Sequence, residues 1–223
     1  TDERLLRNDG QSAFIHTDPW RVMRIQAEFV EGFGALAELG PAVSVFGSAR
    51  AAADSPAYAY GLEVGRQLVE AGYAVITGGG PGAMQAANEG ARRAGAQSIG
   101  LNIVLPHEQA PNEYVTPRLS LRFHYFALRK MHFLLRARAL AAFPGGFGTF
   151  DELFELLTLI QTGKIKPIPV LLFGREFWDK VVNFQALVDE GVVSQRDLGI
   201  FTYVETAEEA WDVVREFYEE QAR

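Results

Sequence analysis

The feature that most constrains the fold is the regular alternation of short apolar runs with amphipathic, helix-forming segments. Short apolar runs bounded by turn residues are typical of strands that are buried on both faces of a sheet. Their alternation with helices predicts a mostly parallel sheet covered on both sides, which is a three-layer, doubly wound, Rossmann-like α/β fold. The expected strands are 42–46, 74–77, 98–105, 120–123, 140–143, 168–173 and 201–204, and the helices between them are 58–71, 83–94, 125–136, 149–161, 177–190 and 207–221.

The N-terminal region is expected to divide at Asp18. We interpret residues 1–17 as an arm, whereas Asp18-Pro19 predicts a helix start, with Asp18 as N-cap and the proline at the first helical position. Apolar residues at helical spacing continue this helix until Gly40-Pro41 ends it. Because 223 residues correspond to one large domain, we expect residues 18–223 to form a single nucleotide-binding domain.

Composition excludes several classes of protein. The chain has no cysteine, so disulfides, thiolate zinc sites and thiol nucleophiles are excluded. The net charge of −7 argues against nucleic acid as a partner, because proteins that bind phosphate backbones present a basic face. No stretch reaches the roughly 18 apolar residues of a membrane span, and residues 1–9 show no signal-peptide segment, so we expect a cytoplasmic protein without a membrane partner. The histidine spacings predict no metal site, and we expect no cofactor.

Two glycine clusters fall at strand-to-helix turns, where ligands bind in sheets of this type. The first, residues 77–83, reads T-G-G-G-P-G-A, and glycines there let the backbone approach a ligand while the next helix offers free N–H groups to an anion. The cluster fits the dinucleotide pattern G-x-G-x-x-A, but it follows the second strand, and Asn102 lies near the place of the ribose-binding acid. This argues against a dehydrogenase. A tight turn that only packs helix on sheet remains an alternative.

The second cluster, residues 144–152, reads P-G-G-F-G-T-F-D-E. Three glycines precede a helix, and Thr149 adds a hydroxyl in its first turn, so a phosphate there would accept several backbone N–H bonds at the positive end of the helix dipole. The G-K-[ST] ending of an NTPase loop is missing. Glu152 allows two interpretations: a capping box with Thr149, or a carboxylate one turn from the phosphate, near the anomeric carbon of a ribose 5-phosphate.

Two further features leave their role open. Arg129 and Lys130 stand in a helix that is apolar on most sides, so they form either its solvent-facing stripe or an inward-facing site. Gly47-Ser48 follows the first strand and could contact a ligand, although Ser48 lacks the G-x-S-x-G context of a nucleophile.

These residues together resemble the Lonely Guy family, the cytokinin riboside 5'-monophosphate phosphoribohydrolases, formerly described as possible lysine decarboxylases. The family pattern P-G-G-x-G-T-x-x-E fits residues 144–152 at every fixed position, and the family's R-K pair, fifteen residues upstream of the proline, matches Arg129-Lys130. The first cluster, residues 78–84, departs slightly from the family's G-G-G-x-x-G-x-M. The helix after residues 18–21 is similar to that of the longer bacterial members.

The resemblance implies hydrolysis of the N-glycosidic bond of a nucleoside 5'-monophosphate, either AMP or a cytokinin riboside monophosphate, to a free base and ribose 5-phosphate. It implies a homodimer or a higher homo-oligomer. It also implies that Arg129 and Glu152 are the catalytic pair, and we expect the arginine to lower the pKa of Glu152. The remaining site residues that it implies are Gly145, Gly146, Gly148 and Thr149 for the phosphate, and Ser48, Arg50, Gly79, Gly80 and Lys130 around the rest of the nucleotide.

Two other functions remain open from the sequence. The chain could be a non-catalytic nucleotide or cofactor carrier, in which Glu152 only caps a helix, or a broad-specificity nucleosidase of nucleotide salvage. A pyridoxal-dependent decarboxylase is disfavoured because that chemistry needs a Schiff-base lysine, and none of the four lysines stands in a recognisable cofactor motif.

Overall fold

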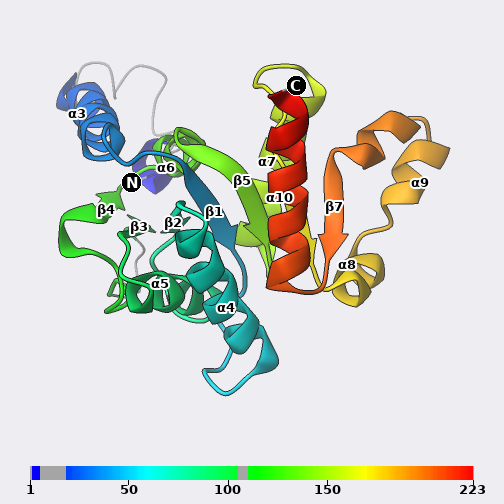
Figure 1. The fold of residues 1–223 in the computed structure, drawn as a ribbon. Helices are drawn as coiled ribbons and strands as arrows, with labels where there is room; N and C mark the ends of the chain where they lie inside the picture. Colours follow the sequence, from blue (N-terminus) through cyan, green and yellow to red (C-terminus); the bar gives the residue numbers. More distant parts are fainter. Residues whose placement is uncertain (1, 6–18, 105–109, 223) are drawn as a thin grey trace.

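The computed structural model describes residues 2–5, 19–104 and 110–222, and it contains one seven-stranded parallel sheet (Figure 1). The strand order is β4-β3-β2-β1-β5-β6-β7, and every neighbouring pair is parallel. The predicted Rossmann-like α/β class is therefore confirmed. The strands are β1 (Ala42–Phe46), β2 (Ala74–Thr77), β3 (Ser98–Ile103), β4 (Ser120–Phe123), β5 (Ala137–Ala142), β6 (Val170–Phe173) and β7 (Phe201–Val204).

Helices connect the strands and cover both faces of the sheet (Figure 1). None of the helices in the described ranges is long and apolar enough to cross a membrane. The α-helices are α1 (Asp2–Leu5), α3 (Pro19–Leu36), α4 (Pro56–Glu70), α5 (Ala83–Arg93), α6 (Phe126–Leu134), α7 (Phe147–Gln161), α8 (Arg175–Val181), α9 (Phe184–Asp189) and α10 (Ala207–Gln221), and two 3-10 helices are η1 (Pro117–Leu119) and η2 (Gln195–Gly199).

The two faces of the sheet bury two separate apolar clusters, because successive side chains of a strand point to opposite faces. In β1, Val43 and Val45 pack with α4, α5 and α10, while Ala42 and Phe46 belong to the cluster that α3, α6, α7, α8 and α9 cover. Strands buried on both sides in this way read as continuous apolar runs, which is why the sequence pattern located them.

The order of strands reverses direction beside β1. The chain leaves β1 toward β2, β3 and β4, then returns across the sheet through α6 to place β5 on the other side of β1. The carboxyl ends of β1 and β5 therefore border a crevice, the place where ligands bind in open parallel sheets.

Several predicted boundaries differ from the structure. The helix expected over 177–190 is two helices, α8 and α9, because Asn183 starts a new helix by accepting a hydrogen bond from the Ala186 N–H. The helix expected over 125–136 ends at Leu134, since β5 already begins at Ala137. Within the expected N-terminal arm, residues 2–5 form α1, whereas Asp18 and the rest of the arm lie outside the described residues.

Candidate active site

A cavity of about 1020 Å³ opens at the crevice between the carboxyl ends of β1 and β5. The turns after both strands contribute to it, and so do the inner faces of α6 and α7. Its polar wall contains the largest group of residues that the sequence singled out, namely Ser48, Arg50, Arg129, Gly145, Gly146, Gly148, Thr149 and Glu152.

Glu152 lies in α7 with only 5% of its surface exposed. Its Oε1 atom is buried and accepts no hydrogen bond from any described residue. Arg129 Nη2, from α6, lies 3.6 Å from that oxygen and supplies an opposite charge. Since buried polar atoms are normally hydrogen-bonded, an unpartnered carboxylate oxygen in a cavity wall is suited to binding a polar group that enters the cavity.

The Arg129 guanidinium is held by aromatic rings of its own helix. Its Cζ atom lies 4.9 Å from the ring centre of Phe126 and 5.4 Å from that of Phe133. The end of α6 is tied to the sheet by the Ser44 hydroxyl of β1, which donates a hydrogen bond of 2.7 Å to the Phe133 carbonyl. Arg129 therefore faces inward, and the interpretation of this residue as part of a solvent-facing stripe is wrong.

Arg129 lowers the pKa of Glu152, as expected, but the net change in this pKa is upward. Burial raises the pKa of Glu152 from 4.5 to about 7, and the opposing charges of Arg129 and Lys130 only reduce this effect. Burial also lowers the pKa of Arg129, although Glu152 opposes that change. Desolvation thus outweighs ion pairing here, because a charge in a poorly solvated place is costly even beside an opposite charge.

The capping-box interpretation of Glu152 is also wrong. The N-cap of α7 is Gly146, which has no side chain, and the Thr149 N–H donates to the Gly146 carbonyl within the first turn. The N–H groups of Phe147 and Gly148, at the start of the helix, precede any intrahelical acceptor, so a helix start of this kind leaves them available to a ligand. A Cβ atom at Gly145 would lie 2.2 Å from Thr149 Oγ1, so the absence of a side chain there makes room for the hydroxyl.

Three residues expected around the nucleotide do not belong to the cavity lining. Lys130 is paired with Asp151 and Glu155. The carbonyls of Gly79 and Gly80 accept hydrogen bonds from the backbone and side chain of Asn112, and in this cluster only Gly78 lines the cavity.

Sequence reasoning missed the apolar wall of the cavity. Phe147, Phe150 and Phe154 recur along one side of α7, and this spacing beside Glu152 was the signal that could have revealed them. The other apolar lining residues are Phe46, Met84, Ile103, Phe126, Phe133, Phe177 and Val181. Among the described residues, no group of three or more His, Asp or Glu side chains could hold a metal ion.

The fold and the cavity define an α/β protein with a cavity at the switch point of a parallel sheet, the usual place of a ligand site, and the cavity contains a buried carboxylate, an arginine and a helix start. Residues 84–214 match the family model described as "Possible lysine decarboxylase", and the chain belongs to this family.

The chain is 30% identical over 161 residues to the cytokinin riboside 5'-monophosphate phosphoribohydrolase LOG2 of Arabidopsis thaliana, covering 70% of this chain and 74% of that protein. It is 31% identical over 152 residues to the phosphoribohydrolase LOG of Oryza sativa subsp. japonica, covering 66% of this chain and 62% of that protein. The resemblance seen in the sequence is confirmed.

Solved structures agree with the fold. The X-ray structure of TM1055 is similar with a TM-score of 0.58 and 27% identity, covering 79% of this chain and 99% of that one. The molybdenum cofactor carrier protein of Chlamydomonas reinhardtii has a TM-score of 0.56 at 23% identity, covering 81% and 99%. Likeness at that identity concerns the fold alone.

Proposed function

We propose that the chain hydrolyses the N-glycosidic bond of a nucleoside 5'-monophosphate, releasing the free base and ribose 5-phosphate. The observation that carries this proposal is the buried, unpartnered oxygen of Glu152, 3.6 Å from Arg129, in the same cavity as the uncapped start of α7. The plant relatives are named as phosphoribohydrolases, and these names support the same reaction.

The phosphate would bind at the start of α7. The turn at Gly145, Gly146 and Gly148 brings backbone N–H groups to the cavity, Thr149 adds its hydroxyl, and the helix dipole favours an anion at that place. Arg50 also lines the cavity and adds positive charge. Because the phosphate is remote from the reacting carbon, its binding energy serves to position the sugar beside Glu152.

Glu152 would act on the sugar and on water. As the bond between C1' and the base nitrogen breaks, its electron pair leaves with the base, and the positive charge that develops on the ribose is stabilised by the carboxylate. Water forms the new bond to C1' and gives one proton to Glu152, which later returns it to solvent, while the departing base nitrogen takes up one proton from solvent. Arg129 would orient the carboxylate and keep it ionised against the effect of burial.

The experiment that tests the proposal is base release from AMP, followed by chromatography. We expect adenine from the native protein and none from Glu152→Ala, while AMP still binds the variant in a calorimetric titration. Glu70→Ala, which removes an exposed carboxylate of α4 outside the cavity, is the matched control and keeps the native rate.

Two results would decide against this reaction. Binding of AMP by the native protein without adenine release favours a nucleotide carrier. Unchanged release by Glu152→Ala removes Glu152 from the mechanism. A panel of purine and pyrimidine monophosphates, with and without an isopentenyl group, then separates a cytokinin-specific enzyme from a broad nucleosidase of nucleotide salvage.

A further inference from the structure

Lys130 is adjacent to Arg129 in α6, but its side chain has different partners. Its ammonium group lies 2.8 Å from Asp151 Oδ1 and 3.1 Å from Glu155 Oε2, and both carboxylates belong to α7. The side chain is only 19% exposed, and it takes no part in the cavity lining. Burial lowers the pKa of Lys130, but its hydrogen bonds to Asp151 and Glu155 raise it, and the net direction is upward, so the lysine stays charged.

The two helices are thus joined by two neighbouring ionic contacts. One joins Arg129 to Glu152 at 3.6 Å. The other joins Lys130 to Asp151 and Glu155, which stand on either side of Glu152 in the sequence of α7. α6 also packs on β3, β4 and α3, and its Phe133 carbonyl accepts a hydrogen bond from Ser44 of β1, whereas α7 begins directly after β5. The Lys130 contacts join these two helices beside the proposed catalytic pair.

We propose that Lys130 is a positioning residue rather than a ligand for the nucleotide: by binding Asp151 and Glu155 it fixes α6 against α7 and so holds the Arg129 guanidinium beside the Glu152 carboxylate. The proposal rests on the function given above, because it assigns Lys130 a part in that same site. It reverses the role that the family resemblance implied for this lysine.

Lys130 and its two carboxylate partners also affect the pKa of Glu152. Arg129 and Lys130 on α6 lower the pKa of Glu152, whereas Asp151 and Glu155 on α7 raise it. Arg50 is the other charged residue in the cavity lining. Removal of the Lys130 charge leaves two carboxylates without their cation, and removal of the Asp151 charge has the opposite electrostatic effect. A group that only stabilised the fold would not produce opposite effects of this kind.

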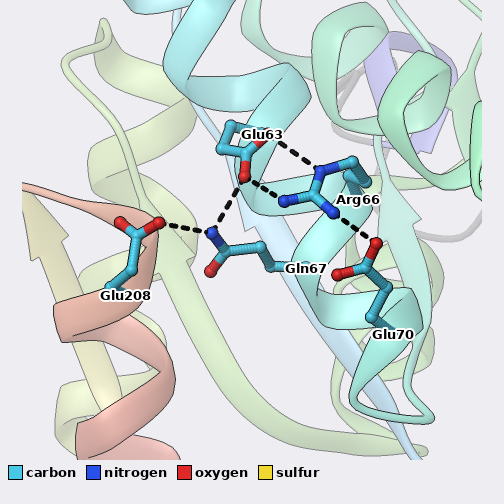
Figure 2. A network of polar contacts seen from close by, with 5 residues as sticks. All are labelled: Glu63, Arg66, Gln67, Glu70 and Glu208. Atoms are coloured by element: carbon cyan, nitrogen blue, oxygen red, sulfur yellow. Dashed lines mark hydrogen bonds and ion pairs between the residues drawn. The ribbon is translucent and has the colours of Figure 1, made fainter.

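The chain offers a matched control in α4. Arg66 also lies between two carboxylates, those of Glu63 and Glu70, and Gln67 beside it links Glu63 to Glu208 of α10 (Figure 2). Both carboxylates that Arg66 binds belong to its own helix, and none of these five residues lines the cavity. Arg66→Met therefore removes a similar cation–carboxylate contact without touching the site.

The experiment compares Lys130→Met, Lys130→Arg, Asp151→Asn and Arg66→Met by two measurements. The first is the pH dependence of kcat/KM for AMP. The second is the titration of the Glu152 carboxyl by ¹³C NMR, assigned by its absence in Glu152→Gln. The NMR titration needs no turnover, so it distinguishes failure of this inference from failure of the proposed function.

We expect Lys130→Met to raise the titration midpoint of Glu152 and Asp151→Asn to lower it, each by about one pH unit. At pH 6, kcat/KM of Lys130→Met then falls about tenfold from this shift alone, and kcat falls further even at high pH because Arg129 is less well fixed. The KM for AMP stays within about twofold. Lys130→Arg keeps the native midpoint, and Arg66→Met changes neither measurement.

Other results would overturn the inference. If Lys130→Met raises the KM for AMP more than tenfold with kcat unchanged, Lys130 binds the nucleotide. If both charge variants move the carboxyl midpoint in the same direction, or not at all, the contact has no part in setting the charge at the site. If the titration midpoints of Glu152 move as expected but neither the native protein nor any variant releases adenine, the inference stands and the proposed hydrolase function fails.

Discussion

The two glycine-rich turns of this chain have similar sequences and follow the two strands that flank β1, yet the structure uses their glycines differently. In the turn after β2, Gly79 and Gly82 have positive φ angles of 70° and 69°. In the turn after β5, none of the three glycines does. Glycine is thus required by backbone conformation in the first turn, whereas in the second it leaves space beside backbone N–H groups.

The polar groups near the two turns show the same difference. Beside the first turn, Asn88 accepts a hydrogen bond of 2.7 Å from the Thr77 hydroxyl and donates one of 2.7 Å to Ser98, while Asn112 binds the Gly80 carbonyl. Beside the second turn, Glu152 and Arg129 each keep a buried polar atom without a hydrogen-bond partner among the described residues. Apart from Asn102 Oδ1, which is buried beside Gly79 without a hydrogen-bond partner among the described residues, the polar groups at the first turn bind one another, whereas the second turn lies beside polar atoms suited to a ligand. We therefore expect substitutions at the first turn to change mainly stability, and those at the second to change mainly binding and rate.

The largest difference in stability is expected between Gly79→Ala and Gly146→Ala. A Cβ atom at Gly79 would lie 2.2 Å from Asn102 Oδ1, on a backbone with positive φ, so the substitution should cost about 3 kcal/mol. At Gly146 a Cβ atom meets nothing within 4 Å, and φ is −95°, so the stability should change by less than about 1 kcal/mol. Thermal unfolding measures both changes. A cost at Gly146 as large as that at Gly79 would show that the second turn is also constrained by its backbone.

The sequence predicts features that leave a local pattern, and it does not predict features that depend on contacts between distant segments. The alternation of apolar runs with helices located every strand, because burial on both faces of a parallel sheet leaves a local pattern. The place of Glu152 and of the glycine turn followed from their position at the end of a strand. The partners of Lys130 could not be predicted, since Asp151 and Glu155 lie on another helix and contact depends on how α6 crosses the sheet. The net pKa of Glu152 could not be predicted either, because the sequence showed the nearby charge of Arg129 but not the degree of burial.

The burial of the Glu152 carboxyl beside the second turn should make the stability of the protein depend on pH. The pKa of its carboxyl is about 7 in the folded protein, against 4.5 ordinarily. Below pH 4.5 the group is protonated in both the folded and unfolded states, and Glu152→Gln should unfold like the native protein. As the pH rises from 4.5 to 7, the native protein loses about 3 kcal/mol of stability that the glutamine variant keeps. Denaturant unfolding at pH 4 and pH 8 measures this. Equal stabilities at pH 8 would mean that the carboxylate is better solvated than its 5% exposure indicates.

The smallest expected effect tests whether the first turn is only structural. Asn112→Ala removes two side-chain hydrogen bonds of 3.0 Å, to the Gly80 carbonyl and to Asn88 Oδ1, as well as the 3.2 Å bond that its own Oδ1 accepts from the Tyr114 N–H. The backbone bond of 2.8 Å from the Asn112 N–H to the Gly79 carbonyl remains, so the loss of stability should be about 1–2 kcal/mol. Urea unfolding measures this loss, and adenine release from AMP at a temperature where the variant is fully folded measures its activity.

For Asn112→Ala we expect kcat and KM within about twofold of the native values, because the cavity lining includes neither Gly79 nor Gly80. Thr158→Ala, which removes a hydroxyl that donates only to the Phe154 carbonyl of its own helix, serves as a control for the general effect of losing a side-chain hydrogen bond. An increase in KM of tenfold or more for Asn112→Ala alone would contradict the division between the two turns. The first turn would then contact the nucleotide directly, as the family resemblance implied for Gly79 and Gly80, and its hydrogen bonds to Asn112 would serve to shape a binding surface.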